Sequence, residues 1–247
     1  MARANKVSTP CVKHTQETEE VLDDNTPYRS AVGSLMYLAI ATRPDIAFAV
    51  STASQKLESP TKADWEAVKR IFKYLRGTTD FGILYKGKAN SRGLEAYSDA
   101  DFAGDVKLRK SMSGVVCKYN GAIITWLSNK QQLTALSTCE AEYIAASEGA
   151  KEVIWLTGLL KELGIKLKTP MLKIDNAGAE KLVRNPEFHK RTKHIAVKYH
   201  FVREKFLNGD FDIEHVASTE QLADIMTKPL GRVRFRELRD GLGLSHV

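Results

Sequence analysis

The sequence predicts an α/β fold in which a mixed sheet is covered by helices and preceded by a small helical region. Two observations support this prediction. Apolar residues recur at helical spacing within residues 27–77, where Val32, Leu35, Met36 and Ala39 take positions i, i+3, i+4 and i+7. From about residue 80 the pattern changes to short apolar runs that first follow one another and then alternate with helical stretches, which is typical of a mixed sheet covered by helices.

The helical region is preceded by about 25 polar residues, which we expect to be an extended or disordered lead. Pro44 should end one helix and open the next. A third helix is expected after Pro60, because Thr61 and Asp64 have the spacing of a capping box and Gly77 is a typical stop.

The strand region contains apolar runs at 81–85, 93–99, 113–119 and 122–127. The dipeptide Asn120-Gly121 is a strong signal for a type I′ hairpin, so the last three runs predict three antiparallel strands. A long helix should follow over 137–163, where small residues would let it lie close to the sheet. The remaining expected elements are a strand at 171–175, helices near 177–184 and 194–207, a strand at 211–216 and a helix near 219–227. The predicted regions are therefore a lead at 1–25, a helical region at 26–78, a sheet domain at 79–230 and a basic tail at 231–247.

The composition fits a globular protein, with 247 residues, 43% apolar residues and 27% charged residues. The net charge of +7 favours polyanionic partners such as nucleic acid. Three widely spaced cysteines argue against a disulfide framework or a cysteine zinc site and favour a reducing setting inside the cell. We expect no membrane span, because no run of about 18 apolar residues occurs, and no signal peptide, because the N-terminal residues are polar.

Four acidic residues are placed where they could reach one metal site. Asp99 and Asp175 each end an apolar run, Glu142 lies early in the long predicted helix, and Asp224 follows His215 by nine positions. Clustered carboxylates repel one another unless a cation neutralises them, and their oxygens suit Mg²⁺ or Mn²⁺. Two such ions can bind a scissile phosphate between them. His215 could shuttle protons, although a packing role at a strand end remains an equal alternative.

Several segments carry a resemblance to one known family. These segments are Tyr97–Asp105, Ser137–Ala146, Ile174–Asn176, Lys193–Ile195 with Tyr199–Glu204, and His215–Val216 with Gln221–Leu230. Together they resemble the ribonuclease H domain of copia-type LTR-retrotransposon Pol polyproteins. Tyr28–Leu38 and Thr42–Ile46 resemble the end of the reverse-transcriptase region of the same polyprotein. The resemblance covers nearly the whole chain from about residue 25.

This resemblance implies a ribonuclease H-like mixed five-stranded sheet and a metal-dependent hydrolase that cuts the RNA strand of RNA–DNA hybrids with two Mg²⁺ or Mn²⁺ ions. It implies Asp99, Glu142, Asp175 and Asp224 as metal-binding catalytic residues, with His215 as the auxiliary histidine. Glu140 competes with Glu142 for the second position. Glu142 is preferred because it leads directly into an apolar run, as the family's glutamate does. Asp101 and Asp105 are disfavoured because they should lie beyond the strand end.

Contacts to the hybrid are expected from basic and amide side chains that can bind phosphate without reading bases. The candidates are Lys107, Arg109, Lys110, Asn129, Lys130, Gln131, Asn176, Lys190, Arg191 and Lys193. The alternative interpretation is that these charges only solubilise the surface.

The polymerase signature Tyr-x-Asp-Asp is absent from the sequence. We therefore expect the C-terminal part of a Pol polyprotein, or a gene derived from one, with the polymerase half as a partner where it is present. A cytoplasmic location is expected, with virus-like particles or the nucleus as alternatives. The alternative function is a catalytically silent nucleic-acid-binding module.

Two other nuclease types fit the residue order less well. A strand-transfer enzyme would order its acids Asp, Asp, Glu, but Asp210 rather than a glutamate stands 35 positions after Asp175. A proofreading exonuclease needs Asp-x-Glu, which the Asp99–Asp101 segment does not supply. A zinc site at the histidines 189, 194 and 200 is disfavoured because spacings of five and six put them on different helical faces.

Overall fold

The computed structural model describes residues 4–13, 20–85, 93–105, 108–185 and 196–247. The chain forms two compact units, one comprising Met1–Leu84 with Pro229–Val247 and the other comprising Tyr85–Lys228. Among the described helices, none combines the length and the apolar character needed to cross a membrane.

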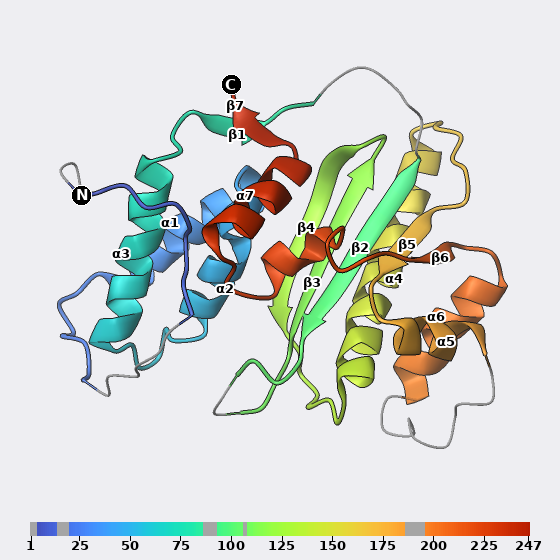
Figure 1. Ribbon diagram of the computed structural model, residues 1–247, viewed down its shortest axis with the longest axis horizontal. Helices are drawn as coiled ribbons and strands as arrows, with labels where there is room; N and C mark the ends of the chain where they lie inside the picture. Colours follow the sequence, from blue (N-terminus) through green and yellow to red (C-terminus); the bar gives the residue numbers. More distant parts are fainter. Residues whose placement is uncertain (1–3, 14–19, 86–92, 106–107, 186–195) are drawn as a thin grey trace. The chain divides into compact units, whose positions relative to one another are not determined.

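The first unit is built from helices, as the sequence predicts for residues 27–77 (Figure 1). Its elements are α1 (Tyr28–Ala41), η1 (Pro44–Ile46), α2 (Ala47–Ser54), α3 (Lys62–Arg76) and α7 (Arg232–Gly241). The predicted capping box is present at the start of α3, where Thr61 and Asp64 exchange hydrogen bonds. Along α1, Val32 and Leu35 are fully buried, but Met36 is 39% exposed and does not belong to the buried stripe.

A two-stranded antiparallel sheet completes the first unit. It pairs β1 (Phe81–Ile83) with β7 (Leu244–His246). The expected strand near 81–85 is therefore present over Phe81–Ile83, but its partner comes from the C-terminal end of the chain. Residues 231–247, which we expected to form a basic tail, contain α7 and β7.

A buried polar network fixes the turn between α1 and α2. Asp45 accepts hydrogen bonds from Arg43 Nε at 2.9 Å and Nη2 at 2.7 Å, and from the Tyr74 hydroxyl at 2.5 Å. Arg43 Nη1 also donates to the carbonyl oxygen of Thr78 at 3.0 Å. Because a buried charge is stable only when it is paired and hydrogen-bonded, these residues hold η1 against the end of α3.

The second unit contains the predicted mixed five-stranded sheet, with strand order β4-β3-β2-β5-β6. Its strands are β2 (Leu94–Asp101), β3 (Met112–Tyr119), β4 (Ala122–Lys130), β5 (Met171–Ile174) and β6 (Asp212–His215). The pairs β2–β3 and β3–β4 are antiparallel, whereas β2–β5 and β5–β6 are parallel. Asn120 and Gly121 both have positive φ, at 50° and 86°, which confirms the predicted hairpin. The predicted fold class is confirmed.

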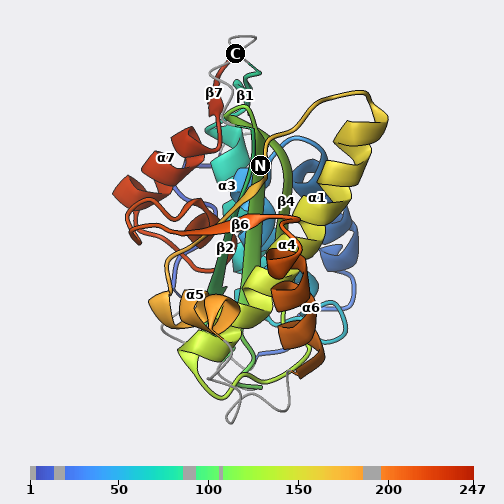
Figure 2. The same cartoon turned by 90° about the vertical axis from the view of Figure 1, so that its right-hand side faces the viewer.

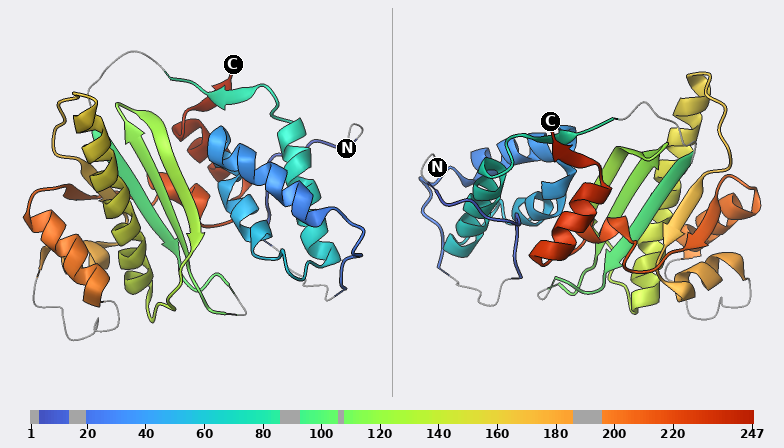
Figure 3. Two further views of the ribbon diagram at one scale, coloured as in Figure 1. Left: turned by 180° about the vertical axis from the view of Figure 1, so that it is seen from behind. Right: turned by 45° about the horizontal axis from the view of Figure 1, so that its top comes forward.

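Helices cover the sheet of the second unit. The long helix α4 (Thr138–Glu162) packs against β2, β3 and β5, as the view from behind shows (Figure 3). Helices α5 (Ala177–Arg184) and α6 (Ala196–Leu207) contact α4 and each other (Figure 2). A Cβ atom added to Gly149 would lie 2.9 Å from Leu172 Cδ1, so the predicted small face does bring α4 close to the sheet.

A short 3₁₀ helix, η4 (Leu222–Met226), packs against β2 and β3 on the other face of the sheet. It stands where we expected a longer helix. A Cβ atom added to Gly114 would lie 2.7 Å from Met226 Cβ and 2.9 Å from the carbonyl oxygen of Ala223. The glycine on β3 therefore lets η4 lie directly on the strand. This close approach places the residues of η4 beside the middle of the sheet.

Candidate metal centre

Asp99 occupies an internal position of β2, opposite Gly114 of β3. The strand continues to Asp101, so the expectation that Asp99 ends it, and that Asp101 lies beyond it, is wrong. Successive strand residues face opposite sides, and Ser98 lies against Gly149 of α4, so Asp99 faces η4. Asp99 is 2% exposed.

The Asp99 carboxylate has two partners near η4. Its Oδ2 accepts a hydrogen bond from Thr227 Oγ1 and lies 3.6 Å from Lys228 Nζ. Burial raises the pKa of Asp99 to about 6, Lys228 and Thr227 oppose this rise, and the neighbouring Asp224 and Asp175 add to it. The carboxylate is thus destabilised by its surroundings and held in place by two donors.

Asp175 reaches the same place because β5 runs parallel to β2. The register pairs Tyr97 with Lys173, and two further residues along each strand lead to Asp99 and Asp175. Asp175 follows β5 directly and is half-buried. The parallel pairing therefore converts two positions 76 residues apart in the sequence into neighbours.

Asp224 is presented by η4, which buried hydrogen bonds join to the sheet. Gln221 caps η4, and its Nε2 donates to the carbonyl oxygen of Ser98 at 2.9 Å. Ser128 Oγ on β4 donates to the carbonyl oxygen of Met226 at 2.6 Å. Asp224 is 7% exposed. These bonds fix the acid over β2, next to Asp99.

The three aspartates form a cluster with the donor chemistry of a metal site. Asp99, Asp175 and Asp224 each offer a carboxylate oxygen, and these oxygens all lie within 4.8 Å of one another. Carboxylate oxygens are the ligands that Mg²⁺ and Mn²⁺ prefer. The structure thus brings together three of the four predicted acids.

Glu142 lies near the N-terminal end of α4 and outside this group of three. It is 8% exposed, and its Oε2 has no hydrogen-bond partner among the described residues. Burial first, and then the charges of Asp99 and Asp175, raise the pKa of Glu142 from 4.5 to about 9. The buried Oε2 of Glu142 has no hydrogen-bond partner in the described part of the chain and is repelled by two neighbouring aspartates. A cation bound at this position would stabilise its charged form.

The rival acid Glu140 has a different place. Its N–H is capped by Ser137 Oγ at 3.2 Å, and its Oε2 accepts the N–H of Leu136 at 2.8 Å. Glu140 therefore takes part in the start of α4, which supports the choice of Glu142. Asp105 forms an ion pair with Lys130 and is not a member of the cluster.

His215 ends β6 and is exposed. The parallel pairing of β5 and β6 places it opposite Ile174, which immediately precedes Asp175. The histidine therefore lies at the edge of the sheet that carries the cluster, although it is not a member of it.

The predicted nucleic-acid contacts have different surroundings. Arg109 and Asn129 are exposed and Lys110 is half-exposed. Gln131 is 4% exposed, and its Nε2 donates to Ser113 Oγ and to the carbonyl oxygen of Ala141, both at 2.9 Å. It is therefore an internal residue and not an available phosphate contact, because its amide joins the end of β4 to α4.

The other predicted contacts are already engaged or lie outside the described residues. Lys130 is paired with Asp105, and Asn176 caps α5 by accepting the N–H of Ala179 at 2.9 Å. The side chains outside the described residues are Lys107, Lys190, Arg191 and Lys193.

Sequence reasoning gave no role to Thr227 and Lys228, which both contact the cluster. Lys228 Nζ lies 2.7 Å from Asp224 Oδ1. The spacing of four residues between Asp224 and Lys228 is a recognised pattern for an ion pair and could have identified the lysine.

No protein-family model matches this chain. The chain is 43% identical over 251 residues to the retrovirus-related Pol polyprotein from transposon RE2 of Arabidopsis thaliana. The aligned region covers 100% of this chain and 17% of that protein. It is 42% identical over 253 residues to the retrovirus-related Pol polyprotein from transposon TNT 1-94 of Nicotiana tabacum, covering 99% of this chain and 19% of that protein. Over its whole length the chain is similar to part of the Pol polyproteins of copia-type retrotransposons.

The chain, called the Pol-like segment below, spans less than a fifth of the length of those two relatives. It is also 47% identical over 133 residues to the secreted RxLR effector protein 161 of Plasmopara viticola, covering 54% of the segment and 93% of that protein. Among solved structures, LC11-RNase H1 isolated from compost is similar with a TM-score of 0.44 and 14% identity, covering 55% of the segment and 92% of that chain.

Proposed function

We propose that this Pol-like segment is a divalent-metal-dependent endonuclease of the ribonuclease H type, which cleaves the RNA strand of RNA–DNA hybrids. The observation that carries the proposal is the convergence of Asp99, Asp175 and Asp224 within 4.8 Å from three different elements. The similarity of the whole chain to part of two Pol polyproteins supports the same activity. Hybrid duplexes and the polymerase part of the polyprotein are the proposed partners.

The proposed metal ligands are Asp99, Asp175 and Asp224, with Glu142 as the fourth. The fit rests on the chemistry of this donor set and on the unpartnered buried oxygen of Glu142. A pair of bound Mg²⁺ or Mn²⁺ ions would activate a water molecule and stabilise the leaving oxygen of a phosphodiester.

The other residues of the site would position these ligands and the substrate. Thr227 holds one orientation of the Asp99 carboxylate through its hydrogen bond. Arg109 and Asn129, which are exposed, are proposed to contact the phosphate backbone. His215, at the strand end next to Asp175, is proposed to carry protons to or from the site. The proposed location is the cytoplasm, where hybrids of a retrotransposon would be made.

Hydrolysis of a labelled RNA–DNA hybrid with Mg²⁺ or Mn²⁺ tests the proposal. The parent protein should cut the RNA strand, and Asp99→Asn should lower the rate by at least about a hundredfold, since losing one stabilising group of this kind costs a few kcal/mol. Asp212→Asn is a matched control, because it removes an exposed carboxylate of the same unit. Cleavage that persists in the Asp99 variant would refute the assignment. Hybrid binding without cleavage by the parent would instead favour the silent binding module.

A further inference from the structure

The acidic cluster contains a positive charge of its own. Lys228 Nζ lies 2.7 Å from Asp224 Oδ1 and 3.6 Å from Asp99 Oδ2. The side chains of Asp99 and Asp224 are only 3% and 10% exposed, whereas that of Lys228 is 36% exposed. One ammonium group thus contacts two buried carboxylates, while part of the lysine side chain reaches solvent.

The backbone of this lysine is fixed by the turn that follows η4. The N–H groups of Thr227 and Lys228 both point to the carbonyl oxygen of Asp224, at 3.2 and 3.3 Å. The Thr227 side chain is bound to Asp99, and the preceding Met226 carbonyl is bound to Ser128. The backbone of Lys228 is therefore held at the cluster independently of the ion pairs that its side chain makes.

The position of the ammonium group conflicts with that of a bound ion. The oxygens of Asp99 and Asp224 that face Lys228 belong to the residues that we propose as metal ligands. A divalent ion and an ammonium group cannot both lie within contact distance of the same two oxygens without strong repulsion. The side chain must then move outward when an ion is bound, and its partial exposure leaves a path to solvent.

We propose that Lys228 is a positioning residue whose ammonium group acts as an internal counter-ion for the metal-free site and competes with a divalent ion for Asp99 and Asp224. This inference rests on the proposed function. In the metal-free state the lysine keeps the two buried carboxylates paired and close together. In the metal-bound state the displaced ammonium group lies at the rim of the site, where a phosphate would arrive. The lysine thereby lowers the affinity of the site for the ion, but it also keeps the two ligands in place before the ion binds.

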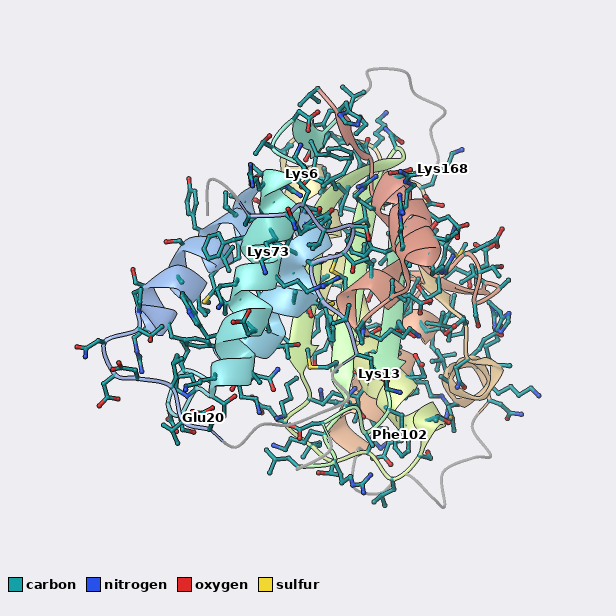
Figure 4. All side chains as sticks on the ribbon, turned by 60° about the vertical axis from the view of Figure 1, so that its left-hand side comes forward. Lys6, Lys13, Glu20, Lys73, Phe102 and Lys168 are labelled. Atoms are coloured by element: carbon teal, nitrogen blue, oxygen red, sulfur yellow. The ribbon has the colours of Figure 1, made fainter. Side chains whose placement is uncertain are left out.

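Binding of Mn²⁺, measured by the loss of its free-ion electron paramagnetic resonance signal, tests this competition. Lys228→Met should bind Mn²⁺ at least about tenfold more tightly than the parent, because the variant lacks the positive charge that repels a divalent ion at the same two carboxylates. Lys228→Arg keeps the charge and should stay close to the parent. Lys168→Met is the control for net charge, since Lys168 is an exposed lysine of the same unit that precedes β5 (Figure 4).

The outcomes separate this inference from the proposed function. Equal affinity of the parent and Lys228→Met, or equal tightening in Lys168→Met, overturns the competition and leaves the metal site intact. A parent protein whose Mn²⁺ binding does not depend on Asp99 overturns both.

A second measurement follows the parent protein itself and uses one charge-conserving variant only to assign a signal. Nuclear magnetic resonance of lysine ammonium groups should show a protected signal for Lys228, identified by its absence in Lys228→Arg. Saturation with Mg²⁺ should remove or shift that signal while the other protected lysine signals stay in place. An unchanged Lys228 signal in protein that has bound Mg²⁺ refutes the displacement.

Discussion

Replacing Glu142 with glutamine should stabilise the metal-free protein at alkaline pH. Glu142 is 8% exposed, and its pKa is raised from 4.5 to about 9, first by burial and then by Asp99 and Asp175. A carboxyl group with a raised pKa in the folded state binds its proton more tightly there than in the unfolded chain. Its contribution to stability is complete below pH 4.5 and is lost as the pH rises toward 9.

The size of this loss follows from the shift. About 1.4 kcal/mol per pKa unit over the interval from 4.5 to about 9 gives an upper limit of about 6 kcal/mol. Because the shift is shared with the Asp99 charge, part of that energy belongs to the pair and not to Glu142 alone. A glutamine has nearly the same shape and no charge, so it should remove most of the pH dependence.

Urea unfolding in the presence of a chelator, at pH 5, 7 and 9, measures the effect. The parent should lose stability steadily over this range, and Glu142→Gln should lose much less. Glu162→Gln, at the exposed end of the same helix, is the matched control and should follow the parent. If Glu142→Gln and the parent fall in parallel, Glu142 is not a strained buried acid and the electrostatic description of the site is wrong.

Three further predictions concern other contacts. Thr227→Val removes the hydrogen bond to Asp99 and should slow hybrid cleavage by about tenfold, whereas Thr227→Ser should not; equal rates for both variants would exclude a role for the hydroxyl group. Asp45→Ala leaves buried partners unpaired and should cost about 3–5 kcal/mol in urea unfolding, and a loss below about 1 kcal/mol would contradict the network. Gly114→Ala should displace η4, cost about 1–3 kcal/mol and weaken Mn²⁺ binding, whereas Gly158→Ala, which meets open space, should do neither.

Local sequence patterns predicted the parts of the fold that depend on short-range chemistry. The hairpin at Asn120-Gly121 and the capping box at Thr61 follow from backbone preferences of a few residues, and the structure contains both. The grouping of Asp99 with Asp175 could be predicted because both follow apolar runs. The parallel pairing of β2 with β5 places the two aspartates together. The sequence indicates this pairing only through the alternation of strands and helices.

Features that depend on distant contacts could not be predicted in this way. The pairing of Phe81–Ile83 with Leu244–His246 joins two strands of three residues, which are too short to show a periodic pattern. Gln131 was expected to contact the hybrid through its amide, but that amide is buried and internal hydrogen bonds offset the cost of its burial. Lys228 follows Asp224 at a spacing that suggests a simple surface pair, and only the folded structure shows its contact with Asp99.

The dependence of η4 on the sheet also decides when the acidic cluster can exist during synthesis. Asp224 comes from the last element of its unit, and the bonds that hold η4 are made by Ser98 and Ser128, which emerge from the ribosome about a hundred residues earlier. A growing chain can therefore assemble the strands while the final ligand is still missing. The cluster of three aspartates is therefore completed only after residue 228 has been synthesised and has left the ribosome, because Asp224 cannot pack beside Asp99 before η4 lies on the sheet.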